Sequence, residues 1–270
     1  MIDFNHRWKT HLKEIEYSPS SLEVKEELHP KFWKNGRLDQ EVMDKLRQIV
    51  DDVVQMLEIP VKIKDVTITG SIAAFNWHSL SDIDLHILLD FREIDENFNL
   101  IKDYLDSKRI NWNKTHKIMI FDHEVELYFQ DVNEEHHSSG AYSVLGDDWI
   151  KEPVREEVEM DLITAEKKAD AISREIDHVS DLFHDKKYKE AYNFSDKIKE
   201  KLRKLRSSGL EREGIYSAEN LAFKILRNER YLERLSSLKI MSYDLMMSVS
   251  GKSNVKIKIM EKWSKFQKNV

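Results

Sequence analysis

Apolar residues recur at helical spacing between Leu38 and Leu57, and this spacing predicts a long amphipathic helix. Pro60 marks its exit. From Val61 to Thr69 the pattern changes to alternation of apolar and polar residues rich in β-branched side chains, which is typical of a strand. Asp82–Phe91 reads as a second strand, alternating at first and then continuously apolar.

Two further strands are expected after an intervening helix. The helix is predicted over Asn97–Lys108, with its apolar residues on one face. Lys117–Phe121 and Glu124–Phe129 are the third and fourth strand-like runs, and Asp122-His123 between them favours a hairpin.

The pattern becomes entirely helical after about Pro153. Expected helices cover Arg155–Phe183, Lys187–Arg206, Ser217–Leu235, Lys239–Val249 and Val255–Phe266. This order predicts an α+β fold, with a mixed β-sheet and flanking helices followed by a C-terminal helical domain. The expected boundaries are 1–152 for the first domain, with a helical lead-in, and 153–270 for the second.

Composition narrows the class of protein. Of the 270 residues, 40% are hydrophobic, which is enough for a core, and none is cysteine. Disulfides and thiolate metal sites are therefore excluded, and a reducing compartment is favoured. The N-terminus is too charged for a secretory signal, and no apolar run reaches the roughly 18 residues of a membrane helix. We expect a cytoplasmic protein without a membrane partner.

Charge is spread unevenly along the chain. Residues 1–150 carry 17 Lys and Arg against 29 Asp and Glu, whereas residues 151–270 carry 26 against 21. The first part is therefore net −12 and the second net +5, which gives the −7 of the whole chain. An acidic part suits cations and a basic part suits phosphates, although most of these charges serve to solvate helices.

The stretch from Thr69 to Asp90 carries the candidate chemistry. Asp82 and Asp84 stand at the start of the second strand, and strand alternation places them on one face. Two carboxylates this close repel each other unless a cation lies between them. Oxygen ligands of this kind suit Mg²⁺ or Mn²⁺.

Two aspartates are few ligands for the pair of ions, about 3.5–4 Å apart, that phosphoryl transfer uses. A third carboxylate is therefore expected from an adjacent strand. Glu126 is preferred because Val125 and Leu127 anchor it in the sheet, and Glu124, nearer the turn, is the alternative.

A Gly-Ser pair ends the first strand. Gly70 allows a phosphate to approach the backbone, and the hydroxyl of Ser71 with backbone N–H groups can hold a phosphate. Neither this pair nor Asp-x-Asp is specific alone, but their order at strand boundaries before an acidic strand is fairly specific.

In these residues the chain resembles the DNA polymerase β-like nucleotidyltransferase superfamily, over Val66–Gln130. The resemblance implies two-metal catalysis with an NTP donor and a hydroxyl acceptor, which is an RNA 3′ end, a small molecule or a protein. It implies that Asp82 and Asp84 bind metal, that Glu126 binds the catalytic metal and helps the acceptor lose its proton, and that Ser71 holds triphosphate. The third acid is often Asp in that superfamily and is Glu here.

A longer pattern is similar to uncharacterised nucleotidyltransferase-domain proteins of tailed phages. It consists of LHPKFW, SDIDLHI, VELYFQD, SSGAYSVL and SAENLAFKILR, and it covers most of the chain. This resemblance implies no particular substrate.

Two further residues are candidates for binding the nucleotide. Tyr142, after a glycine turn, could stack on a nucleobase or be an ordinary packed tyrosine. In relatives the helical domain often lends a lysine to the phosphates, and Lys224 is the candidate here. The basic stretch Lys197–Arg206 is either a solvated helix face or a surface for RNA or triphosphate. A catalytically silent nucleotide- or RNA-binding module and a partner-binding scaffold are the alternative functions.

Overall fold

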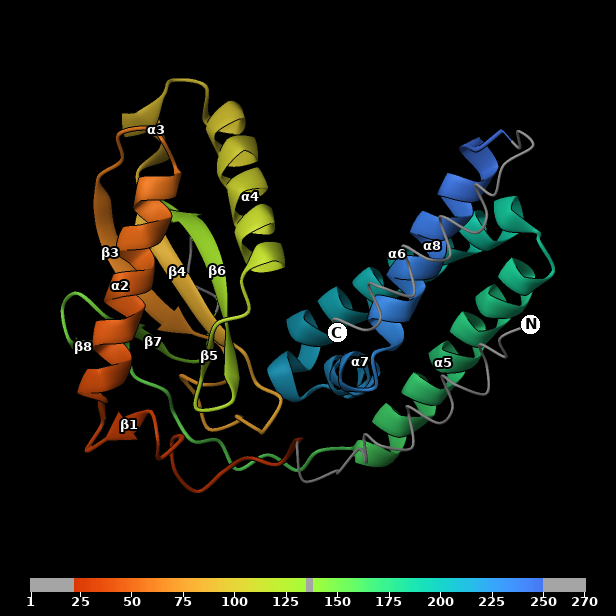
Figure 1. Ribbon diagram of the computed structural model, residues 1–270. Coiled ribbons are helices and arrows are strands. Elements are labelled where there is room, and N and C mark those ends of the chain that lie inside the picture. The colour runs from red at the N-terminus through yellow and green to blue at the C-terminus, as the bar shows by residue number, and fades with distance from the viewer. Residues whose placement is uncertain (1–21, 135–137, 250–270) are drawn as a thin grey trace. The chain divides into compact units, whose positions relative to one another are not determined.

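The computed structural model describes residues 22–134 and 138–249 (Figure 1). The chain divides into two compact units, which are described separately below. One is Pro19–Val158, and the other is Glu159–Val270 together with Met1–Ser18. The division thus lies a few residues after the expected boundary at 152. The helix expected over Val255–Phe266 lies outside the described residues.

The first unit begins with a short hairpin and a long helix. Strands β1 (Trp33–Lys34) and β2 (Arg37–Leu38) pair around Asn35 and Gly36, which have φ values of 54° and 77°. Positive φ at both central residues is what a tight two-residue hairpin needs. Helix α2 (Gln40–Met56) begins after Asp39, whose side chain accepts a hydrogen bond from the backbone N–H of Glu41.

The sheet of this unit has six strands in the order β5-β6-β4-β3-β7-β8. Their bounds are β3 Ile63–Thr69, β4 Ile83–Leu89, β5 Met119–Ile120, β6 His123–Asp131, β7 Ala141–Ser143 and β8 Asp148–Lys151. Strands β4 and β6 are parallel and the other neighbours are antiparallel, so the sheet is mixed. Helices α3 (Phe91–Ile94) and α4 (Phe98–Thr115) connect β4 to β5.

The structure corrects the expected hairpin and adds four strands, β1 and β2 in the short hairpin and β7 and β8 in the sheet. The turn between β5 and β6 is formed by Phe121 and Asp122, both at positive φ, and His123 is instead the buried first residue of β6. Strands β7 and β8 cover a stretch in which the sequence pattern predicted no strand. They are too short for alternation to be visible in the sequence.

One face of the sheet is apolar and the other is polar. Ile83, Leu85 and Ile87 are fully buried and share a core with Leu46 and Val50 of α2. Asp84 and His86 alternate with them and are half-buried. Because successive side chains of a strand point to opposite faces, helix α2 covers the apolar face and the acids lie on the other.

The second unit is helical in its described part. It contains α5 (Leu162–His184), α6 (Tyr188–Glu213), the short 3₁₀ helix η2 (Gly214–Tyr216), α7 (Ala218–Asn228) and α8 (Tyr231–Met247). The helix expected to run from Ser217 to Leu235 is divided near Arg230, whose φ of 59° is left-handed, and α8 then continues through the expected break. In the described residues, none of the helices has the length and apolar character needed to span a membrane.

Candidate active site

Gly70 follows β3 in a tight turn directly against Asp84 of β4. Its φ is +74°, and a Cβ added there would lie 1.8 Å from Oδ2 of Asp84. A side chain at position 70 would therefore collide with the carboxylate, and left-handed backbone also disfavours any other residue. The absence of a side chain at position 70 therefore both permits the turn and leaves room for the Asp84 carboxylate.

Asp84 lies in a row of polar residues that crosses three strands. The β3–β4 register pairs it with Thr69, and the parallel β4–β6 register pairs it with Glu126. We call Thr69, Asp84 and Glu126 the acidic row. Two carboxylates on adjacent strands repel each other when no cation lies between them.

Glu124 and Glu126, the two candidates for the third acid, have different surroundings. Glu124 lies opposite Met119 of β5, and its carboxylate accepts a hydrogen bond of 2.6 Å from the ammonium of Lys117. Glu126 lies opposite Asp84. The register therefore brings Glu126 into the acidic row and gives Glu124 a cation partner of its own.

Tyr128 orients Glu126. Its hydroxyl donates a hydrogen bond of 2.6 Å to Oε2 of Glu126, two residues earlier on the same strand face. Burial raises the pKa of Tyr128 above its ordinary value, and Glu126 and Asp84 raise it further. The phenol therefore stays protonated as a donor beside the two acids.

The segment between β3 and β4 is tied together at its two ends. The hydroxyl of Ser71 donates to Oγ of Ser81 over 2.8 Å, and that same oxygen accepts from the backbone N–H of His78. Ser71 follows Gly70, and Ser81 precedes Asp82, which stands half-buried just before β4. The Gly-Ser turn and Asp82 are therefore held near each other by side chains within this segment.

A buried pair of histidines, His29 and His123, contacts the segment between β3 and β4 at Ser81. Nδ1 of His123 lies 2.6 Å from the carbonyl oxygen of Ser81, and its Nε2 lies 3.2 Å from Nε2 of His29. Burial, and next the neighbouring His123, lower the pKa of His29 to about 4. His29 is thus neutral at neutral pH, and His123 links the start of β6 to the residue before Asp82.

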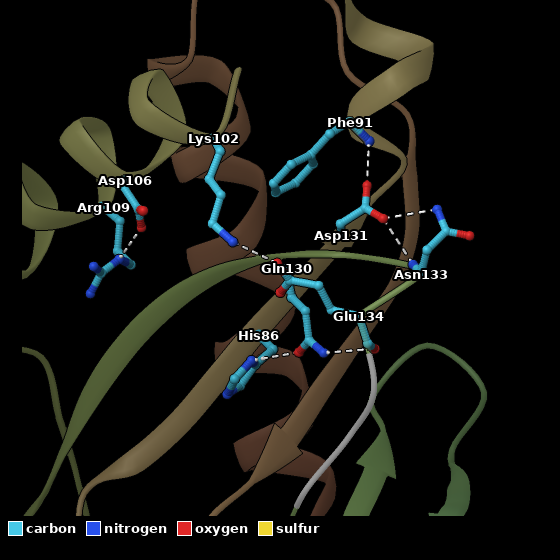
Figure 2. A network of polar contacts seen from close by, with 9 residues as sticks. All are labelled: His86, Phe91, Lys102, Asp106, Arg109, Gln130, Asp131, Asn133 and Glu134. Atoms are coloured by element: carbon cyan, nitrogen blue, oxygen red, sulfur yellow. Dashed lines mark hydrogen bonds and ion pairs between the residues drawn. The ribbon is translucent and has the colours of Figure 1, made fainter. Parts of the chain in front are cut away.

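A second polar row lies deeper on the same sheet face. It pairs Thr67 with His86 and His86 with Tyr128, and the rings of His86 and Tyr128 stack 4.9 Å apart. Figure 2 shows Nδ1 of His86 beside Oε1 of Gln130, at 2.9 Å. The imidazole is therefore held by aromatic and amide neighbours within the sheet.

Asp131, the last residue of β6, has a structural role (Figure 2). Its carboxylate accepts hydrogen bonds from the backbone N–H groups of Phe91 and Asn133 and from the Asn133 side chain. Burial opposes its ionisation, but these bonds outweigh burial and lower the pKa of Asp131. This acid joins the end of β6 to the start of α3.

The donor set fits a hard divalent cation. Asp82, Asp84 and Glu126 offer only oxygen atoms, which are the preferred ligands of Mg²⁺ and Mn²⁺. The space that a Cβ of residue 70 would occupy is filled by the Asp84 carboxylate, so the turn leaves this oxygen room. In residues 22–134 and 138–249, no three His, Cys, Asp or Glu side chains are already gathered as a metal-ligand group.

One of the two further predicted nucleotide-binding residues, Tyr142, does not join this group. Tyr142 is fully buried between Trp33 and Trp149, and its hydroxyl donates to Asp147 over 2.6 Å. Its ring has no free face for a nucleobase, so it is a packing residue of β7 and we do not retain it. Lys224 belongs to α7 of the helical unit.

Tyr128, Ser81 and His123 are the residues near the acids that sequence reasoning missed. Tyr128 could have been found, because strand alternation places it on the face of Glu126. Ser81 bonds to Ser71 and His78 within its own loop, a contact that the apolar pattern does not mark, and His123 has its partners His29 and Ser81 in other segments.

The chain thus has an α+β fold with an open six-stranded mixed sheet and acids on its polar face. Comparisons with known proteins add no family: no protein-family model, no curated protein and no solved structure matches it.

Proposed function

We propose that the chain is a metal-dependent nucleotidyltransferase, which transfers a nucleoside monophosphate from an NTP to a hydroxyl acceptor. One observation carries the proposal. The Gly70 turn packs against Asp84, and Asp84 lies opposite Glu126 on the parallel strand. Two or three carboxylates that can hold divalent cations beside a tight backbone turn are what such a transfer requires.

Each residue has a separate part in the proposed reaction. The acceptor hydroxyl attacks the α-phosphorus, and pyrophosphate leaves as the bond to the β-phosphate oxygen breaks. Bound Mg²⁺ or Mn²⁺ would neutralise the triphosphate and lower the pKa of the acceptor hydroxyl. Asp82 and Asp84 would hold the cation, Glu126 would take part in removing the acceptor proton, and Tyr128 keeps Glu126 oriented.

The Gly-Ser turn holds the leaving side of the triphosphate. Backbone N–H groups at Gly70 and Ser71 would provide the donors, as N–H groups in a tight turn do for anions. The Ser71 hydroxyl already donates to Ser81, so its main part is to keep the turn beside Asp82. Ser71→Ala should therefore weaken binding of the NTP only mildly.

The test is transfer of label from each α-labelled NTP with Mg²⁺ or Mn²⁺. Asp84→Asn and Asp82→Asn should each lower transfer by at least about a hundredfold, since both remove a charge that stabilises the reacting phosphate. Asp103→Asn is the matched control, because Asp103 is an exposed acid of α4 outside the acidic row. It should keep full activity.

Melting curves distinguish a site residue from a structural one. Asp84→Asn should leave the metal-free protein as stable as the wild type or more so, because it removes repulsion from Glu126. Mg²⁺ with NTP should raise the melting temperature of the wild type much more than that of the variant. Full activity in Asp84→Asn, or unfolding of this metal-free variant, refutes the assignment.

Binding of NTP without transfer to RNA, protein or small-molecule acceptors favours the silent nucleotide-binding module instead.

A further inference from the structure

The helical unit contains a groove that the proposed reaction does not use. Its volume is about 460 Å³, and helices α6, α7 and α8 line it. The floor is apolar and includes Leu202, Phe223 and Leu235. Three cations of α6, Lys199, Arg203 and Arg206, line it as well. We call this the cationic groove.

The three cations follow one another along a single face of α6. Residues four and three apart in a helix are neighbours on its surface, so Lys199, Arg203 and Arg206 form a line. At about 1.5 Å per residue this line is roughly 10 Å long. Lining of this length suits an extended chain of charges better than a single ion.

In the part of the chain that the structure describes, Lys199, Arg203 and Arg206 form no salt bridge, although Asp196 acts electrostatically on Lys199 and Glu200 on Arg203. The acids nearby are already paired: Glu200 with Lys204 and Asp196 with Lys239. No Asp or Glu lines the groove. Three like charges beside one apolar floor repel each other, and an anion in the groove would relieve that repulsion.

Helix α7 adds cations and an aromatic ring at the same place. The Arg206 guanidinium lies over the Phe223 ring, 4.5 Å from its centroid. Burial, then the neighbouring Arg227 and Arg206, lower the pKa of Lys224 to about 8, which places these three cations close together. Neither Lys224 nor Arg227 has a salt bridge to any residue that the structure describes.

We propose that the cationic groove binds a single-stranded polynucleotide, with successive phosphates along α6 and a base against the apolar floor. A positive groove that follows the backbone, combined with flat side chains that receive bases, is how proteins bind single strands without reading sequence. Both an aromatic ring and a guanidinium plane can stack on a base. A strand bound here is the acceptor class only if the proposed transfer reaction holds, but the binding itself does not depend on it.

The experiment measures binding of a fluorescent single-stranded RNA of about twelve nucleotides to the full chain, without NTP or metal. The variant Lys199→Gln/Arg203→Gln/Arg206→Gln removes the groove cations. Lys197→Gln/Lys201→Gln/Lys204→Gln is the matched control, because it removes three cations from the same helix that do not line the groove. The groove variant should bind at least about tenfold more weakly, and the control should stay within about threefold.

Salt dependence gives a second readout. Each phosphate contact contributes about 0.7 to the slope of log affinity against log salt for single strands, so the groove variant should lose about 2 from that slope. Arg203→Gln/Arg206→Gln, at two exposed positions, is the second variant if the triple variant unfolds. Asp84→Asn should bind the RNA like the wild type, so failure of the chemistry and failure of the groove give different results.

Equal losses in the groove variant and the control would overturn the proposal, since they would show only the effect of net charge. Competition experiments distinguish a polynucleotide ligand from a small phosphorylated one. Unlabelled single-stranded RNA should displace the probe at far lower concentration than ATP or tripolyphosphate. Displacement by all three at similar concentrations would refute a polynucleotide site and assign the groove to a small phosphorylated ligand.

Discussion

The carboxylate of Asp84 occupies the place where the Cβ of any side chain at position 70 would lie, so Gly70 and Asp84 fit closely together. The separation between an added Cβ and Oδ2 of Asp84 would be 1.8 Å, far below any real contact. The two residues belong to different strands that pair antiparallel, with Thr69 opposite Asp84. The acid and the turn are thus one structural unit.

Gly70→Ala should therefore damage both stability and function. Gly36 supplies the matched control, because its φ is +77° against +74° for Gly70 but nothing lies within 4 Å of its added Cβ. Gly36→Ala should cost about 1–2 kcal/mol from the left-handed backbone alone. Gly70→Ala should cost at least about 1 kcal/mol more, measured by urea unfolding, because Asp84 must move.

A double-mutant cycle isolates that contact. Replacing Asp84 by Ala should recover most of the excess cost of Gly70→Ala, because the clash is then absent. Equal destabilisation by Gly70→Ala and Gly36→Ala would mean that Asp84 moves aside freely, and the close fit would then have no consequence.

Glu126 and Glu124 give a second matched comparison. Glu126→Gln should lower transfer by at least about a hundredfold while sparing much of the NTP binding, because Glu126 is assigned to the acceptor proton. Glu124→Gln should stay within a few-fold of the wild type, because it loses only the ion pair with Lys117, worth about 0–1 kcal/mol at a surface. Single-turnover labelling and NTP titration check both. The reverse ordering would make Glu124 the third acid.

The buried His29 predicts a pH dependence of stability. Its pKa is about 4 in the folded chain against 6.5 ordinarily, so below pH 6.5 the unfolded chain binds the proton more readily. His29 therefore does not lower the free energy of unfolding above about pH 6.5, but this free energy decreases as the pH falls from 6.5 towards 4. Urea unfolding followed by tryptophan fluorescence measures it, since the Trp77 ring lies 4.3 Å from that of His29.

His29→Gln should flatten this part of the pH profile because it removes the titrating group. His116→Gln is the control, since His116 is exposed at the end of α4. The control should keep the wild-type slope. Parallel profiles for wild type and His29→Gln between pH 6.5 and 4 would show that His29 does not carry the effect.

The long elements of the first unit follow from the sequence because their apolar spacing is long enough to identify. Helix α2 and strands β3 and β4 lie within the expected ranges, differing at the ends where Asp39 caps the helix and where Asp82 precedes the strand. Alternation along β4 also separates the polar Asp84 from the buried Ile83 and Leu85.

Other features needed the three-dimensional pairing. The neighbours of Tyr142 include Trp33, more than a hundred residues earlier, so its burial has no local signal. The break between helices α7 and α8 at Arg230 also has no signal in the sequence, because the spacing of apolar residues does not reveal a left-handed backbone at an arginine. The hairpin of β1 and β2 was not predicted, although Asn-Gly is a dipeptide typical of such a turn.

The parallel pairing of β4 with β6 has a consequence for how the protein forms. Asp84 and Glu126 meet only after two helices and strand β5 have been placed between their strands. Contacts between residues so distant along the chain close large loops and are slow steps of folding. During synthesis, Asp82 and Asp84 emerge well before strand β6, which carries Glu126. We therefore expect the acidic row to form late in folding, and a chain truncated before β6 would contain Gly70 and Ser71 but lack Glu126.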